Sequence, residues 1–221
     1  DFYIYNNDFG LFKRLIEQRK DEYTHYVIIP HFIEGEEKAY EVINALPKEQ
    51  LIILDKIIPR ISGEFGAVYQ NFERDIYTSL EKAAEELAKY HTLNLIFPEN
   101  SYAPREIIEG FINFCRDFAF NYQIIADITE EIIHEGQAYI NIMEDDLVIL
   151  IEKIIAQSLV MGKEVGVVSY NETPLKRLLL NGITTMSTDF KAMGRTAAEL
   201  ILSNSKEHFE NPFYLTVRAS L

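Results

Sequence analysis

The sequence predicts an α/β fold built on parallel sheets. Short β-branched or apolar runs recur along the whole chain, and segments of helical period separate them. Strands that alternate with helices in this way form parallel sheets with helices on both faces. The chain has 221 residues, 48% of them hydrophobic, which is enough for one large core or two smaller ones.

The apolar runs and stripes place the individual elements. We expect strands at residues 3–5, 26–29, 51–54, 93–97, 123–126, 139–142 and 165–168. Apolar residues at helical spacing predict helices over 12–19, 76–87, 107–115 and 147–157. No linker or repeat divides the chain, so two lobes would have to share several crossing strands.

Charge and composition limit the possible functions. The chain carries 21 Lys and Arg against 35 Asp and Glu, a net charge of -14, so a phosphate backbone would repel it. We therefore expect any DNA contact to come from a segment outside this sequence. The single cysteine, Cys115, lies in an apolar run and reads as a core thiol. We see no leader and no apolar stretch of about 18 residues, so we expect a cytoplasmic protein without membrane contact.

Polar side chains follow the predicted strands, where open α/β sheets bind their ligands. The polar strand ends are residues 30–32, 55–56, 98–101, 143–146 and 170–173. The acidic trio Glu144, Asp145 and Asp146 has three readings: a helix cap by Asp145 or Asp146, a ligand contact, or a Mg²⁺ site.

Motifs of common enzymes are missing from the sequence. There is no phosphate loop, no nucleophile elbow, no Gly-x-Gly-x-x-Gly and no pair of histidines on one helix face. His25 and His31 flank one strand but lack a third ligand for zinc. We therefore expect no catalytic residues, no metal and no cofactor.

Three segments in the last third of the chain resemble the LacI/GalR family of transcription regulators. They are Val-Gly-Val-Val-Ser-Tyr-Asn-Glu-Thr-Pro at 165–174, Gly-Ile-Thr-Thr-Met-Ser-Thr-Asp-Phe at 182–190 and Met-Gly-Arg-Thr-Ala-Ala at 193–198. Weaker similarity covers the whole chain, including 26–30, 54–55 and 105–111. The combination most resembles regulators that join a GntR-type winged helix to a LacI-type sensor. The winged helix is absent from this sequence, and so are the sensor's first strand and helix, since residues 2–6 resemble its second strand.

The resemblance implies two Rossmann-like lobes of the periplasmic-binding-protein type I, joined by three crossing strands. One lobe would comprise 1–69 and 190–211, and the other 70–189 and 212–221. In this family the lobes close on a small effector, often a sugar, and a homodimer transmits the change to DNA-binding heads. The closest alternative is an exported sugar-binding protein that feeds a transporter.

Family contact positions can be carried over one at a time. Those of the first lobe match or adjoin His31, Asp55 and Tyr69. Those of the second lobe match or adjoin Ser101, Arg105, Glu144, Asp146, Asn171 and Thr188. Tyr69 or Tyr102 offers an aromatic face for a pyranose ring. The chain departs from the family at Asn171, Glu144 and Arg105, so the resemblance does not identify the sugar.

Overall fold

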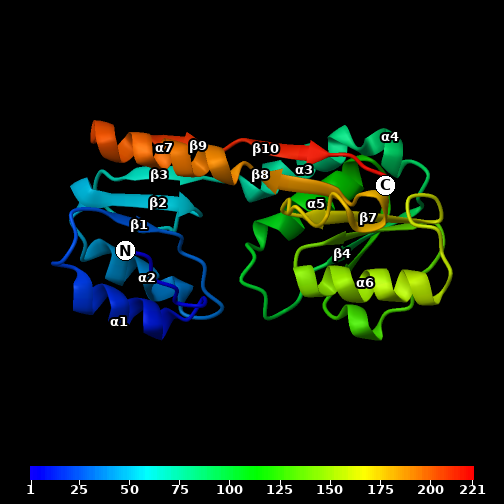
Figure 1. Cartoon of the computed structure of the whole chain (residues 1–221), viewed down its shortest axis with the longest axis horizontal. Helices are drawn as coiled ribbons and strands as arrows, with labels where there is room; N and C mark the ends of the chain where they lie inside the picture. Colours follow the sequence, from blue (N-terminus) through cyan, green and yellow to red (C-terminus); the bar gives the residue numbers. More distant parts are fainter. The chain divides into compact units, whose positions relative to one another are not determined.

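In the computed structural model, which describes residues 1–221, the chain forms two compact units. Unit 1 comprises Asp1–Gln70 and Asp189–Pro212, and unit 2 comprises Asn71–Thr188 and Phe213–Leu221. The chain therefore passes three times from one unit to the other, after residues 70, 188 and 212. Figure 1 shows these passages by colour, because orange and red segments occur in both units.

Unit 1 is built on a four-stranded parallel sheet. Its strands, in spatial order, are β1 (Tyr26–Ile28), β2 (Leu51–Asp55), β3 (Gly66–Tyr69) and β9 (His208–Glu210). Leu51 and Ile53 pack with α1 (Phe9–Arg19) and α2 (Glu36–Asn44), whereas Ile52 and Leu54 pack with α7 (Phe190–Ser203). Successive side chains of a strand point to opposite faces, so helices cover both sides of this sheet.

Unit 2 is built on a six-stranded sheet in the order β10-β8-β7-β6-β4-β5. Its strands are β4 (Thr92–Ile96), β5 (Asn121–Ile125), β6 (Gln137–Asn141), β7 (Val165–Tyr170), β8 (Thr184–Thr188) and β10 (Phe213–Thr216). All neighbours are parallel except β10, which runs antiparallel to β8 at one edge. Helices α3 (Phe72–Lys82), α4 (Ala84–Leu87) and α5 (Glu106–Asp117) pack on one face. Helix α6 (Glu144–Ala156) packs on the other (Figure 1).

Helices α3 and α5 approach each other closely because of a glycine. A Cβ added to Gly110 of α5 would lie 2.1 Å from the carbonyl oxygen of Glu73 and 2.6 Å from a methyl group of Ile76. No larger residue fits there without displacing α3. Phe111 and Phe114, both fully buried, complete this core.

Most predicted elements are confirmed, and the exceptions have physical reasons. Residues 3–5 do not form a strand: no neighbouring strand pairs with them, and the Tyr5 ring packs on Phe12 and Phe32 instead. The predicted 76–87 helix begins earlier, where Asn71 caps α3 by accepting from the Arg74 amide at 3.2 Å, and it breaks at Ala83. Helix α2 was not predicted.

The expected cap of α6 is wrong. Met143 occupies the N-cap position without a side-chain hydrogen bond, and Asp145 and Asp146 lie in the first turn. There the carboxylates face the positive end of the helix dipole. None of the helices is long and apolar enough to span a membrane.

Candidate functional site

In unit 1, three polar side chains meet at the carboxyl end of the sheet. His31 follows β1, Asp55 ends β2, and Gln70 follows β3. Because these strands are parallel and adjacent, their carboxyl ends lie at the same edge. This is the edge at which open α/β sheets bind ligands.

Asp55 is held by both of its neighbours. His31 is 7% exposed, and its Nε2 lies 2.5 Å from Asp55 Oδ2. An ionised carboxylate only accepts hydrogen bonds, so Nε2 is the donor. The Gln70 side-chain amide donates to Asp55 Oδ1, and the Gln70 backbone amide donates to the Asp55 carbonyl at 2.8 Å. Asp55 has φ +73°, a strained left-handed conformation that binding sites often retain. The structure thus brings the predicted His31 and Asp55 together and fixes the carboxylate.

Tyr69, the third residue predicted in unit 1, is the last residue of β3 and is half-buried. Its carbonyl accepts from the Asn211 backbone amide at 2.7 Å, which ties β3 to the segment after β9.

In unit 2, the predicted residues also follow parallel strands at their carboxyl ends. The loop after β4 carries Ser101 and the exposed Tyr102, and Arg105 is exposed at the N-cap position of α5. The Ser101 hydroxyl accepts from the Ala103 amide at 3.0 Å and lies 3.8 Å from the sulfur of Met143. The loops after β4 and β6 therefore touch.

Arg105 and Glu109 form no ion pair, although they lie one turn apart on α5. The Arg105 guanidinium is therefore not neutralised by Glu109.

Glu144 and Asp146 lie on the first turn of α6 in different environments. Glu144 pairs with the buried Lys176 at 2.9 Å. Asp146 Oδ2 is buried without a hydrogen-bond partner. Burial, reinforced by the nearby carboxylates of Asp145 and Asp127, raises the pKa of Asp146 above its usual range. A hydrogen-bond donor placed at Asp146 Oδ2 would relieve this penalty.

No three His, Cys, Asp or Glu side chains group closely enough to hold a metal ion. The Mg²⁺ reading of the acidic trio therefore has no set of three ligands.

Asn171 and Thr188 complete the predicted set. Asn171 follows β7 with φ +61°, and its backbone amide donates to the Met186 carbonyl at 2.8 Å, while its side-chain oxygen is buried without a partner. Thr188 is the buried last residue of β8.

Three further residues lie at these edges and are not predicted from the sequence: Gln70, Asn141 and Lys176. Asn141 ends β6, is fully buried, and donates to the Met143 carbonyl at 2.9 Å while its own Oδ1 has no partner. An amide within an apolar run is the signal that would have identified it. Gln70 directly follows β3, and Asp55 is the last residue of β2, so a polar residue where a strand ends is the signal for both.

Buried acceptors without a partner are common to the two edges. They are Gln70 Oε1 in unit 1 and Asn141 Oδ1, Asp146 Oδ2 and Asn171 Oδ1 in unit 2. Native proteins satisfy nearly all buried polar atoms, so a set of open acceptors calls for water or a ligand. These atoms suit a molecule that presents several hydrogen-bond donors.

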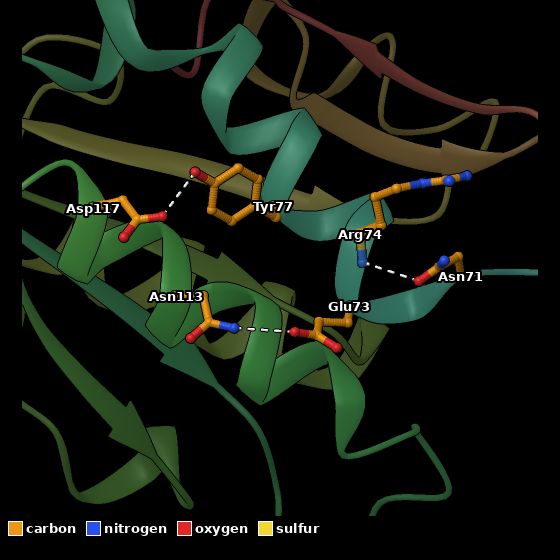
Figure 2. Close-up of a pocket in the computed structure, with 6 residues that line it drawn as sticks. All are labelled: Asn71, Glu73, Arg74, Tyr77, Asn113 and Asp117. Atoms are coloured by element: carbon orange, nitrogen blue, oxygen red, sulfur yellow. Dashed lines mark hydrogen bonds between the residues drawn. The ribbon is translucent and has the colours of Figure 1, made fainter.

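A separate pocket of about 450 Å³ lies in unit 2 between α3 and α5 (Figure 2). Its side chains are largely paired with one another: Tyr77 donates to Asp117 at 2.9 Å, and Asn113 donates to Glu73 at 3.0 Å. We therefore regard this pocket as part of the helix packing and not as the candidate site.

Comparison with known proteins identifies the fold. No protein-family model and no curated protein matches the chain. A solved LacI family transcriptional regulator from Lactobacillus casei with bound glucose matches with a TM-score of 0.73 and 14% identity, over 97% of this chain and 85% of that one. The chain has the fold of LacI-family regulators. This likeness confirms the predicted two-lobe fold of the periplasmic-binding-protein type.

Two further structures support the same fold. A probable maltose operon transcriptional repressor from Staphylococcus aureus has a TM-score of 0.77 and 14% identity, over 96% of this chain and 82% of that one. A LacI family regulator from Enterococcus faecium with bound ribose has a TM-score of 0.72 and 17% identity, over 94% and 82%. These neighbours are regulators and not enzymes.

Proposed function

We propose that this chain is the effector-sensing domain of a bacterial transcription regulator and that its effector is a small carbohydrate. The fold supports the proposal, and so do the neighbours of that fold that hold glucose and ribose. The proposed sugar-binding residues are the ten predicted from the sequence, together with Gln70 and Asn141. We propose that these residues bind the sugar.

The observation that carries the proposal is the set of buried acceptors without partners. Gln70 Oε1, Asn141 Oδ1, Asp146 Oδ2 and Asn171 Oδ1 all accept hydrogen bonds, and sugar hydroxyl groups donate them. Tyr69 and Tyr102 add aromatic faces against which a sugar ring packs.

The charges favour a neutral sugar over a sugar phosphate. Lys176 is 2% exposed, and its ammonium donates to the carbonyls of Tyr170 and Asn171 while it pairs with Glu144. His31 is engaged with Asp55. Arg105 is then the single exposed cation of the set, against three carboxylates.

Regulation would follow from linkage between sugar binding and the conformation of the protein. A sugar that binds one conformation better raises the population of that conformation by no more than its differential affinity allows. We further propose a cytoplasmic homodimer without enzymatic activity. Its DNA contact would come from a winged-helix domain of the GntR type, since a net charge of -14 disfavours DNA binding by this chain itself.

A thermal-shift screen with neutral monosaccharides and sugar phosphates tests the proposal. A sugar at a hundred times its dissociation constant adds about 2.7 kcal/mol of stability. We expect Asp146→Asn and Gln70→Ala to weaken binding by about tenfold or more, as loss of a hydrogen bond to a buried partner does.

Asp117→Asn is the matched control, because Asp117 lines the separate pocket between α3 and α5. This variant should bind the sugar as tightly as the parent protein does. The proposal would be contradicted if no sugar stabilised the protein while a metabolite of another class did.

A further inference from the structure

Unit 2 buries a lysine at the carboxyl end of its sheet. Lys176, in the segment between β7 and β8, is 2% exposed, although lysine side chains are almost never fully buried without a partner. Burial lowers the pKa of Lys176 below its usual range, and the carboxylate of Glu144 opposes this shift. A cation in such a place requires partners that stabilise it there.

Each donor of the Lys176 ammonium has an acceptor. An ammonium carries three N–H groups. Lys176 Nζ donates to the carbonyls of Tyr170 and Asn171, at 2.9 and 2.8 Å, and it lies 2.9 Å from Oε1 of Glu144. Tyr170 ends β7, Asn171 follows it, and Glu144 is the first residue of α6, after β6. A single ammonium therefore joins the loops after β6 and β7, and both loops carry proposed sugar-binding residues.

The backbone on both sides of this contact is attached to β8. The Ile183 amide, directly before β8, donates to the Lys176 carbonyl at 2.7 Å. The Asn171 amide donates to the carbonyl of Met186, within β8, at 2.8 Å. Lys176 is thus fixed to the sheet by its backbone and reaches the end of β7 and the start of α6 with its side chain.

These contacts determine where the open acceptors of unit 2 lie. Asn171 has φ +61°, a left-handed conformation that asparagine tolerates, and in this conformation its carbonyl accepts from Lys176. The side-chain oxygen of Asn171 is left buried without a partner, and so is Oδ2 of Asp146 in the first turn of α6. Removal of the Lys176 ammonium would take away the donor shared by both loops, so the Asn171 side chain would no longer be held relative to α6.

We propose that Lys176 is a positioning residue of the sugar site, whose ammonium holds Asn171 and the start of α6 in the geometry that accepts the sugar. Lys176 does not itself touch the sugar, because all three of its donors are engaged within the protein. The inference rests on the proposed function and names a residue on which the affinity of that site depends.

Titration calorimetry with the neutral monosaccharide that stabilises the parent protein most in the thermal-shift screen tests this role. Lys176→Met keeps the length of the side chain and removes the ammonium, and we expect it to raise the dissociation constant by about tenfold or more. Lys153→Met is the matched control, because Lys153 of α6 also donates to two carbonyls, those of Thr129 and Glu131, at 2.7 and 2.8 Å. Both variants should melt at a lower temperature than the parent, but Lys153→Met should bind the sugar as tightly as the parent does.

A double-mutant cycle separates positioning from a general loss of stability. Asn171→Gly removes the side-chain amide without straining the backbone at φ +61°. If Lys176 acts by holding Asn171, this substitution should weaken sugar binding about tenfold in the parent and less than about threefold in Lys176→Met. If Lys176→Met does not fold, Lys176→Gln replaces it, since its amide still donates to one carbonyl, and the same coupling is expected.

Three results would overturn the role of Lys176: an unchanged affinity in Lys176→Met, an equal weakening by Lys153→Met, or additive losses in the cycle. Each of them leaves the proposed function intact, because the parent protein still binds the sugar. A parent protein that binds no sugar would instead refute the proposed function, and the positioning role with it.

Discussion

The buried carboxyl of Asp75 provides a prediction whose magnitude follows from the structure. Asp75 lies on α3 and is 5% exposed, and its Oδ2 has no hydrogen-bond partner. Burial raises the pKa of Asp75 from 3.8 to about 6, opposed by the charge of Arg74 and a hydrogen bond from the Asn71 backbone. The substitution Asp75→Asn keeps the shape of the side chain and removes the charge that burial penalises.

The expected gain follows from the raised pKa. Each pKa unit corresponds to about 1.4 kcal/mol, so a rise of about 2 units costs the folded protein about 3 kcal/mol once Asp75 is ionised in both states. Well below pH 3.8 the carboxyl is protonated whether folded or unfolded, and the penalty vanishes. Between about pH 4 and 6 the folded state holds a proton that the unfolded state has lost, so stability falls as pH rises. Asp75→Asn should therefore stabilise by up to about 3 kcal/mol at pH 7.5 and by less than about 1 kcal/mol at pH 4.

Urea unfolding followed by circular dichroism at the two pH values measures both effects. Asp145→Asn, an exposed acid of the same unit, is the control and should change the free energy of unfolding by less than about 0.5 kcal/mol. Equal gains at both pH values, or a loss at pH 7.5, would refute the reasoning, because the Asp75 carboxylate would then be stabilised where it lies.

Three further substitutions test the packing and capping that support the two edges. Gly110→Ala should destabilise by about 1–3 kcal/mol, because its Cβ would lie 2.1 Å from the Glu73 carbonyl; thermal unfolding at or above the parent temperature would contradict this. Phe111→Ala should cost about 3–5 kcal/mol in urea unfolding, since Phe111 is fully buried; a cost below about 1 kcal/mol would show that the core refills the space. Asp189→Ala should cost about 1 kcal/mol by removing the cap that accepts from the Ala192 amide at 2.9 Å, and an unchanged melting curve would refute that role.

Most strands were predictable because their runs of apolar side chains indicate burial in a core. Val165–Tyr170 is buried at every position, as a continuous apolar run between helices indicates. Residues 3–5 are also apolar or aromatic, but no strand lies beside them. A strand requires a partner that its own sequence does not specify. Helix α2 was missed because its apolar residues, Ala39, Val42 and Ile43, form too short a stripe.

The candidate site was predictable where a polar residue ends a strand. Asp55 follows an apolar run, and its position alone places it at the edge of the sheet. Asp55 and Gln70 are 15 residues apart in the sequence, and they meet only because β2 and β3 pair in this register. Local sequence patterns do not predict that register. The cap by Asp145 or Asp146 is wrong because α6 begins at Glu144, which places both residues inside the helix and leaves Met143 at the N-cap position.

Hydrogen exchange with and without a bound monosaccharide tests the central claim most directly, because it reports on each unit separately. If the residues at the sheet edges bind the sugar, its addition should slow exchange at the segments around Asp55 and Gln70 in unit 1. It should also slow exchange around Asn141, Asp146 and Asn171 in unit 2. Protection of one unit alone, or protection only at the pocket between α3 and α5, would contradict the account.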